Sequence, residues 1–539
     1  MRRPECVTSY AGLGAALLSF LPLSAALPIF GAIRCEIVLA SAGSMPYSSC
    51  RMGRIVKETV SGVKWGMLQK CTLQPITLVY GIILARLLTP AETGIMGLTA
   101  IFFAVADTLA SAGFGSALIR KQDRTEADCS TMFWFNLSMS FLMGLILFLL
   151  APWFASFYNQ PELLWMTRIS AVMMFIGSSA SVHWCLYSVR RDFKTPAIVG
   201  MVTTIVGLPV GLGFAYYGYG VWSLVIQGVV QGLLSLIIIW IISPWKPHFI
   251  WSNRSFKEMF GFGSKLAASG LLHTLYSEAR TFIIGKFFMA AQLGLYSKAN
   301  HLVSMPPGTI NGMLKTVTYP ILSTIQDDDA RLTLVYRKYL RVSTLPIAWG
   351  MCLMMALGEP LVHLLYGESW MGCVIYLQIL CMAYAFDHVC IINLNLLQVK
   401  GRSDLFLRLE IIKKSISIAM LLAAAFIFKS VEAICWAAAI YTQFAVYINS
   451  YYTGKLIGLT WWEQQKDYWP FMLLSIAACL PAYLLTFSPL PDYAQLALGG
   501  VTAVLLYFGI LRRRKDETYL EFANIMATKF PKLKGVLGV

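Results

Sequence analysis

The chain has 539 residues, of which 57% are hydrophobic and only 13% are charged. Soluble domains are about half apolar and a quarter charged, so this composition excludes an ordinary soluble protein and indicates a membrane protein with many spans. The net charge of +16 does not indicate nucleic-acid binding, because the basic residues form short clusters between apolar segments, as in the cytoplasmic loops of membrane proteins.

Residues 1–51 are the hardest segment to interpret. They contain an apolar run at about residues 11–33 that two prolines interrupt. A signal peptide and an extra span both fit this pattern, and so does a mis-assigned start, with the protein beginning at Met52. We favour the mis-assigned start, because an extra span would invert the orientation of every later loop.

From residue 63 onward the chain contains about fourteen apolar segments, most of about 20 residues or more. A helix of that length crosses the ~30 Å hydrocarbon core of a bilayer. We therefore predict an all-α polytopic membrane protein with spans near residues 63–88, 92–119, 131–155, 163–187, 196–217, 220–242, 260–288, 293–320, 342–358, 371–398, 405–428, 432–455, 468–487 and 493–511.

The distribution of Lys and Arg between these segments predicts their orientation. Alternate loops hold basic clusters, such as those at 120–124, 190–194 and 512–515. The intervening loops, such as 156–162 and 358–370, contain no Lys or Arg. Basic loops stay in the cytoplasm, so we expect both termini to be cytoplasmic.

Two stretches share one layout at an offset of two hundred residues: the first reads IILARLLTPAETGIM and the second reads FIIGKFFMAAQLGLY. Each has one cation (Arg86 or Lys286), two large apolar residues, a short turn with alanine, and a glycine (Gly94 or Gly294). They lie between spans one and two and between spans seven and eight, so each half has six helices. An even number of helices leaves both halves in the same orientation, as parallel pseudo-repeats.

The repeat divides the chain into two lobes with additional segments at the ends. Ligands of transporters built in this way usually bind between the halves, near the bilayer midplane. The predicted parts are an N-terminal extension 1–51, an N-lobe 52–256, a C-lobe 257–456, two further spans in 457–511 and a basic cytoplasmic tail 512–539.

Three segments of the chain resemble a known family. They begin LLTPAETGIMGLTAIFF, IIGKFFMAAQLGLYSKA and INLNLLQVKGRSDLFLR. Over about residues 54–510 the chain is similar to the polysaccharide-transport branch of the multidrug/oligosaccharidyl-lipid/polysaccharide exporter superfamily, and above all to its colanic-acid and teichuronic-acid exporters. One position departs from that pattern: Arg280 stands where related exporters often carry an acidic residue.

The resemblance implies a flippase that works in the bacterial inner membrane. Its two lobes would form a V-shaped, alternating-access cavity. Its substrate would be an undecaprenyl-diphosphate-linked oligosaccharide, a repeat unit of O-antigen, capsule or exopolysaccharide. A polysaccharide polymerase and glycosyltransferases are then candidate partners.

Ionisable residues inside spans are energetically unfavourable, so each is a candidate functional group. Counting residues along the spans places Glu278 and Arg280 of span seven at about the same membrane depth as Lys298 and His301 of span eight. One carboxylate neutralises one cation there, which leaves a positive charge suited to a diphosphate. We predict substrate contacts at Arg280 and Lys298, with Lys265 as a further cavity candidate.

For the other ionisable residues the sequence leaves two interpretations of their role open. Lys70 of span one, also a candidate for substrate binding, and Asp107 of span two can pair structurally or line the cavity. His273 and His301 are packed histidines or proton-coupling groups. Asp387 of span ten is part of a polar stripe and is a further candidate for ion coupling.

Two local patterns concern the helices themselves. The run 305–308 (MPPG) interrupts span eight, as a hinge or as irregular packing. In span eleven, the spacing of Glu410, Lys413 and Lys414 favours ion pairs within one helix.

Catalytic motifs are absent from the sequence. It has no Walker A sequence, no HExxH, no Gly-x-Gly-x-x-Gly after a strand, and no two cysteines closer than eight residues. We therefore expect a protein that is not an enzyme and has neither metal nor cofactor. The main alternative is a cation-coupled multidrug exporter, with Asp107, Glu278 and Asp387 as coupling groups. A polysaccharide polymerase or ligase fits less well, because the longest predicted external loop is only about residues 358–370.

Overall fold

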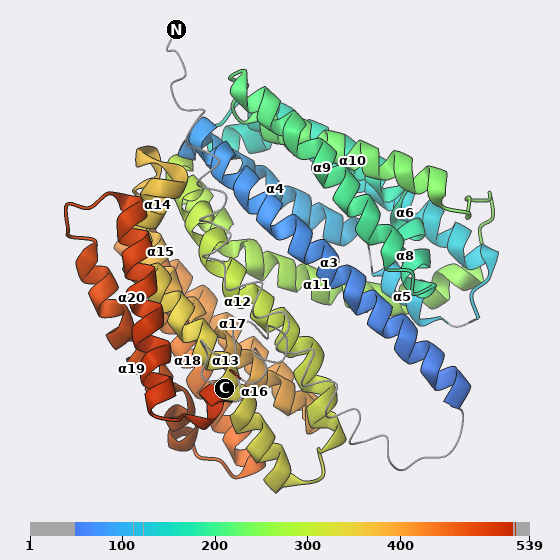
Figure 1. The fold of residues 1–539 in the computed structure, drawn as a ribbon. Coiled ribbons are helices and arrows are strands. Elements are labelled where there is room, and N and C mark those ends of the chain that lie inside the picture. The colour runs from blue at the N-terminus through green and yellow to red at the C-terminus, as the bar shows by residue number, and fades with distance from the viewer. Residues whose placement is uncertain (1–48, 112, 122, 521–522, 524–539) are drawn as a thin grey trace.

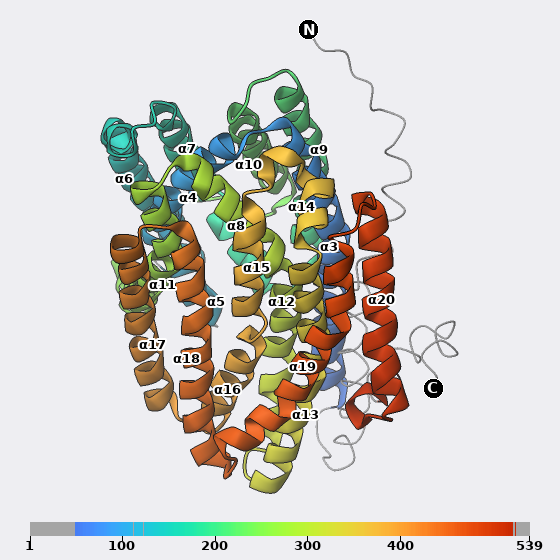
Figure 2. The same cartoon turned by 90° about the vertical axis from the view of Figure 1, so that its left-hand side faces the viewer.

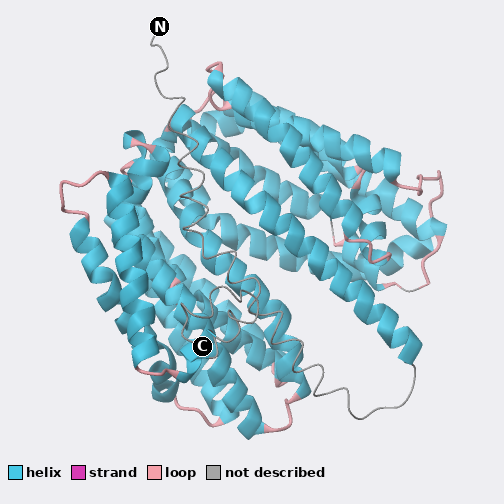
Figure 3. Cartoon of the chain, in the orientation of Figure 1, coloured by secondary structure: helices cyan, strands magenta, loops and turns pink. Residues whose placement is uncertain are grey.

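The computed structural model describes residues 49–111, 113–121, 123–520 and 523, which form helices and no strands (Figures 1 and 3). This confirms the predicted all-α class. The predicted N-terminal extension lies largely within residues 1–48, which are outside the described part of the chain. Most of the predicted tail, after residue 520, also lies outside it.

The first half of the chain forms six spans, of which the second and fourth are each made of two helices. Its elements are α3 (Ser49–Leu87), α4 (Pro90–Ser111), α5 (Phe114–Arg120), α6 (Glu126–Tyr158), α7 (Leu163–Ser178), α8 (Ser181–Val189), α9 (Lys194–Tyr216) and α10 (Trp222–Ile242). The pair α7 and α8 is bent by 44°.

The second half repeats this plan and adds two helices. Its elements are α11 (Asn253–Phe287), α12 (Ala290–Thr324), α13 (Asp329–Ala356), α14 (Gly358–Tyr366), η1 (Glu368–Trp370), α15 (Cys373–Tyr384), α16 (Asp387–Val399), α17 (Ser403–Ala423), η2 (Ala424–Phe428), α18 (Val431–Ile457), α19 (Trp461–Leu485) and α20 (Asp492–Arg513).

Each of the fourteen expected spans corresponds to a described helix or pair of consecutive helices. Within the described ranges, eleven helical segments are long and apolar enough to cross a membrane, and the bent pair of α7 and α8 makes a twelfth. The two remaining spans, α11 and α12, have 35 residues each but do not meet the same test of composition. They carry most of the polar residues that the sequence marks as functional candidates.

Local sequence explains several helix ends. Thr125 and Thr460 each form a capping box with the acidic residue three positions later, so the first turns of α6 and α19 are closed by their own side chains. At the end of α18, Gly458 has a φ of 68°, a left-handed conformation that glycine adopts without strain.

The helices form two lobes arranged as a V (Figure 1). We call α3–α10 the N-terminal lobe and α12–α20 the C-terminal lobe. The lobes meet at the end where α14 lies, the convergent end, and α3 and α12 draw apart toward the opposite, divergent end. α19 and α20 pack on the rest of the C-terminal lobe along its outer edge (Figure 2).

Helix α11 crosses between the lobes. It packs mainly along α4, α5 and α6, and it also contacts α12 and α17. Its first turns are tied to the N-terminal lobe, because the Lys121 Nζ lies 2.9 Å from Asp128 Oδ1 and 3.0 Å from Glu258 Oε2. The hydrogen bond to Asp128 raises the pKa of Lys121 above its ordinary value.

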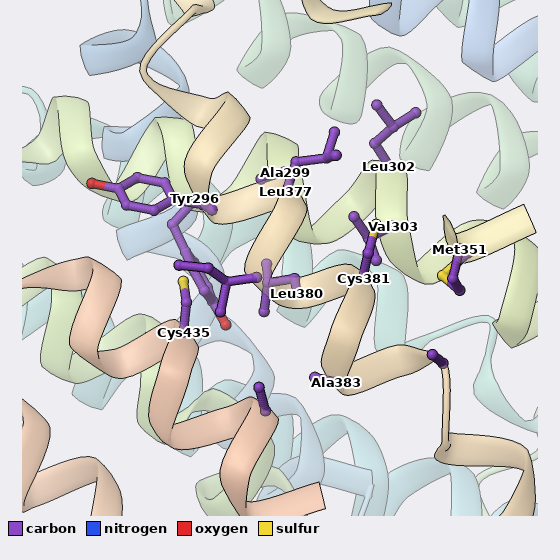
Figure 4. Close-up of a cluster of buried hydrophobic side chains, with 14 of the residues drawn as sticks. Tyr296, Ala299, Leu302, Val303, Met351, Leu377, Leu380, Cys381, Ala383 and Cys435 are labelled. Atoms are coloured by element: carbon purple, nitrogen blue, oxygen red, sulfur yellow. The ribbon is translucent and has the colours of Figure 1, made fainter. Parts of the chain in front are cut away.

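The largest buried apolar cluster lies mainly in the C-terminal lobe, where α12, α15 and α18 pack together (Figure 4). Aromatic, aliphatic and sulfur side chains from these helices interlock, which makes this lobe a rigid support for polar groups at its margin. Members of the cluster include Tyr296, Val303, Leu377, Leu380 and Cys435.

The two copies of the sequence repeat meet at the convergent end. A Cβ atom built on Gly94 would lie 1.9 Å from the carbonyl oxygen of Ala290. One built on Gly294 would lie 1.8 Å from the carbonyl oxygen of Pro90. Only glycine permits this approach of α4 and α12, and the matched distances show that the copies contact each other symmetrically.

Candidate functional site

Arg280 lies in a pocket of about 280 Å³ at the margin of the C-terminal lobe. The pocket is formed by α11, α12, α15 and α17, so it joins the crossing helix to the C-terminal lobe. Arg280 is the only charged residue among the described residues that line it. The polar lining residues are Tyr276, Ser277, Arg280, Thr281, Tyr296, Asn300, Tyr384 and Ser417.

The helix period explains why Arg280 faces this pocket. Tyr276 lies four residues earlier on α11 and therefore on the same face. Arg280 interacts with the hydroxyl of Tyr296, and Tyr384 approaches from α15. A guanidinium surrounded by hydroxyl groups keeps its charge and presents planar N–H donors, an arrangement suited to phosphate oxygens.

Hydrogen bonds hold two of the three tyrosines of the pocket in place. The hydroxyl of Tyr276 donates to Ser417 Oγ on α17 at 3.0 Å. The hydroxyl of Tyr384 donates to Asn300 Oδ1 on α12 at 3.0 Å. These bonds link four elements around one guanidinium, so the pocket is preformed in this conformation.

Lys298 lies outside this pocket, at the interface between the lobes. Its Nζ is 3.4 Å from the carbonyl oxygen of Gly81 on α3, and 5.6 Å from the ring centroids of both Tyr366 and Trp370. A second polar contact joins the same two helices, since Gln74 Nε2 donates to Thr309 Oγ1 at 3.3 Å. Lys298 therefore contributes to the contact between α3 and α12 in this conformation.

The expected pairing around Glu278 is not formed. Arg280 turns toward the tyrosines of its pocket and Lys298 turns toward the backbone of α3, so within the described residues Glu278 forms an ion pair with neither. The shared depth of these residues was predicted, but depth does not fix the direction in which each helix face points.

Lys70 and Asp107 do not pair either. Both side chains are exposed in the described part of the chain. The pairing fails because α3 packs along α9 rather than along α4, although α3 and α4 are consecutive. A role for either residue in binding or ion coupling stays a prediction.

The remaining candidates lie apart from the Arg280 pocket. Lys265, His273 and His301 have exposed side chains on α11 and α12. Asp387 begins α16, where a carboxylate is favoured by the positive end of the helix dipole. Its neighbour His388 is buried and bonds Thr344 Oγ1 through Nε2 at 2.8 Å, a structural contact.

The expected pairing within span eleven is confirmed. Lys413 Nζ lies 2.5 Å from Glu410 Oε1, and Lys414 Nζ lies 3.9 Å from Glu410 Oε2. Lys413 is 4% exposed, so this pair neutralises a buried cation inside α17. The run 305–308 continues as helix within α12, and no break divides the element there.

Sequence reasoning did not identify the uncharged polar residues that line the pocket. Tyr276, Tyr296, Asn300, Tyr384 and Ser417 carry no charge, so an argument from buried charge did not select them. The one available signal was the spacing of Tyr276 and Arg280, which places an aromatic hydroxyl one helical turn from the cation.

Comparison with known proteins places the chain in a family. Residues 83–375, more than half of the chain, match the family described as "Polysaccharide biosynthesis protein". The matched region begins at the second residue of the first copy of the sequence repeat and extends into α15.

Curated relatives agree with that match. The teichuronic acid biosynthesis protein TuaB of Bacillus subtilis (strain 168) is 26% identical over 66% of this chain and 74% of its own. The succinoglycan biosynthesis transport protein ExoT of Rhizobium meliloti (strain 1021) is 26% identical over 58% of this chain and 64% of its own.

A similar fold occurs in a structure of the lipid II flippase MurJ in an inward closed conformation. It has a TM-score of 0.67 at 12% identity, and the match covers 84% of this chain and 99% of that one. At this identity the likeness concerns the fold alone. The chain is a multi-pass membrane protein and, as its sequence predicted, it belongs to the polysaccharide biosynthesis protein family.

Proposed function

We propose that the protein is a flippase that moves polyprenyl-diphosphate-linked oligosaccharides across the bacterial inner membrane by alternating access. The named roles of its relatives support this proposal, since TuaB is a biosynthesis protein for teichuronic acid and ExoT a transport protein for succinoglycan. The two-lobed fold, shared with a lipid II flippase, is a second support. Polymerases and glycosyltransferases are its proposed partners.

The observation that carries the proposal is the chemistry of the Arg280 pocket. The described lining contains one cation and no carboxylate, together with three tyrosines. A diphosphate linkage is an anion with adjacent sugar rings, which the guanidinium and the aromatic faces can hold together. At about 280 Å³ the pocket is near the lower limit for a small-molecule site, so it would hold the linkage and not the whole oligosaccharide.

The proposed orientation has both termini in the cytoplasm. The basic loop that contains Lys121 then marks the divergent end as cytoplasmic, and the convergent end is periplasmic. In this orientation the structure corresponds to an inward-facing state, in which the substrate would reach the Arg280 pocket from the cytoplasmic leaflet.

A cation-coupled drug exporter is the second candidate. It requires a carboxylate in the binding site, and the acidic candidates Asp107, Glu278 and Asp387 do not line the Arg280 pocket. A polymerase or ligase would need catalytic groups on the periplasmic side, where α14 and η1 fill the longest predicted loop. We therefore propose transport and not catalysis.

A reconstitution experiment separates these functions. Purified protein in proteoliposomes is given a polyprenyl-diphosphate oligosaccharide or, separately, a fluorescent organic cation under a proton or sodium gradient. The proposal predicts transfer of the lipid-linked sugar at a rate above that of protein-free vesicles, and no gradient-dependent movement of the cation. Cation efflux without lipid transfer would favour the drug exporter.

A further inference from the structure

Arg86 and Lys286 occupy equivalent positions in the sequence repeat, and each bonds to backbone carbonyls in the other half of the chain. Arg86 Nε donates to the carbonyl oxygen of Leu365 at 3.1 Å, and its Nη2 donates to that of Leu364. Lys286 Nζ donates to the carbonyl oxygen of Phe157 at 2.7 Å and lies 3.6 Å from the centroid of its ring.

Both acceptors are the last carbonyls of a helix. Phe157 lies in the final turn of α6, and Leu364 and Leu365 lie in the final turn of α14. Such carbonyls have no partner within the helix, and a helix C-terminus attracts cations. In the first half the C-terminus of the third span, α6, is therefore capped by Lys286 of α11. In the second half the C-terminus of α14, the short helix after the third span, is capped by Arg86 of α3.

Each acceptor is fixed in its own lobe. Phe157 stacks on Trp153 of the same helix, with ring centroids 5.0 Å apart. α14 is held to the outer helix α20 by a hydrogen bond between His363 Nδ1 and Asp492 Oδ2. These contacts keep each acceptor with its lobe when the lobes move relative to each other.

Each donor is fixed as well. Only residues 88–89 separate α3 from α4, so Arg86 stays with the N-terminal lobe. Only residues 288–289 separate α11 from α12, so the end of α11 that carries Lys286 is tethered to α12, while α11 also packs on α4 and α6 of the N-terminal lobe. α12 in turn packs against α13, α15 and α16 of the C-terminal lobe.

We propose that Arg86 and Lys286 are paired latches that hold the convergent end closed and that must both release before this end opens. This inference rests on the proposed alternating access. Gly94 and Gly294 allow the backbones to touch but supply no charge, so the latches provide much of the directional attraction across this contact. An opening of about 530 Å³ beside Arg86, lined also by Ser369 and Tyr366, gives water a route to replace its carbonyl partners.

Distance measurements between the lobes test the latches without substrate. Spin labels attached through non-canonical amino acids at Glu162 and Glu368, both exposed and on opposite lobes at the convergent end, report its separation. In wild type we expect mainly the short distance. Arg86→Gln and Lys286→Gln should each raise the ratio of long to short distances by about ten-fold, the value of one charge-assisted hydrogen bond, and the double variant should raise it further.

Control variants separate latching from general damage. Lys429→Gln changes an exposed cation between the C-terminal helices η2 and α18 and should keep the wild-type distances. Arg86→Lys and Lys286→Arg retain a donor and should restore most of the short distance, whereas a misfolding defect would not be rescued by charge. Unchanged distances in both single variants and the double variant would overturn the proposal.

The outcome is independent of the transported molecule. Widened distances in the latch variants, with no lipid transfer by wild type in proteoliposomes, would keep the latches and reject the flippase. Lipid transfer by wild type with unchanged distances would keep the flippase and reject the latches.

Discussion

Gly94 and Gly294 lie two hundred residues apart in the chain and face each other where α4 meets α12. A Cβ on Gly94 would clash with the carbonyl oxygen of Ala290, four residues before Gly294. A Cβ on Gly294 would clash with that of Pro90, four residues before Gly94. This reciprocal contact places a pseudo-twofold relation between the halves at the convergent end. The repeat is therefore a contact between lobes as well as a sequence pattern.

Alanine at either glycine should disturb this contact. A methyl group 1.8 to 1.9 Å from a carbonyl oxygen cannot be accommodated without moving the helices. We expect Gly94→Ala and Gly294→Ala each to lower stability by about 1–3 kcal/mol, measured by thermal unfolding in detergent. Gly228→Ala, where a Cβ would meet open space, should be neutral or stabilising. Equal effects at Gly228 and Gly94 would contradict the close contact.

Lys298 and Arg280 should differ in their effect on diphosphate binding. Lys298 already contacts the carbonyl oxygen of Gly81 and two aromatic rings, whereas Arg280 faces a pocket. In detergent, Arg280→Ala should weaken the binding of inorganic diphosphate by about ten-fold or more, because it removes a charge-assisted contact. Lys298→Ala should change it by less than about two-fold. Calorimetric titration measures both, and a larger loss at Lys298 would move the site to the interface.

Asp467 should stabilise the C-terminal lobe. It is 1% exposed and accepts hydrogen bonds from Arg337 Nε at 2.8 Å and Arg341 Nε at 2.7 Å, which tie α13 to α19. Asp467→Asn leaves both cations without their counter-charge, and because they are partly exposed we expect a loss of about 1–3 kcal/mol. Asp404→Asn, which changes an exposed pair with Arg402, should have no measurable effect on unfolding. Similar melting temperatures for both variants would contradict this ranking.

The anchor of α11 at Lys121 should not depend on pH in the physiological range. Because its hydrogen bond to Asp128 raises the pKa of Lys121, its contribution is complete below the unfolded value of 10.5 and is lost only as pH rises through the higher folded value. The difference in melting temperature between wild type and Lys121→Gln should stay constant between about pH 6 and 9. A difference that disappears by about pH 8 would show that another group controls the anchor.

Hydropathy predicted most of this fold from the sequence. All fourteen spans correspond to helices or helix pairs, because a bilayer imposes both the length and the apolar character of each one. The offset of Arg86 and Lys286 likewise predicted two matched halves. The carbonyls that these cations bind were not predictable, because they are backbone groups that any residue carries.

The candidate site was predicted only in part. Arg280 stood out because an ionisable residue inside a span is rare. Its tyrosine neighbours did not, since neutral aromatic residues are common in apolar helices. Glu278 and Lys298 were placed at a matching depth, and Lys70 and Asp107 on consecutive spans. Neither depth nor order along the chain specifies which neighbour a helix packs against.

Transfer of a polyprenyl-diphosphate oligosaccharide in proteoliposomes by wild type, Arg280→Ala and Lys257→Ala tests the central claim most directly. Lys257 is an exposed cation on the same helix, outside the pocket. The proposal predicts transfer by wild type and Lys257→Ala, and a rate at least about ten-fold lower for Arg280→Ala. An unchanged rate for Arg280→Ala would contradict the assigned diphosphate contact, and no transfer by wild type would contradict the flippase itself.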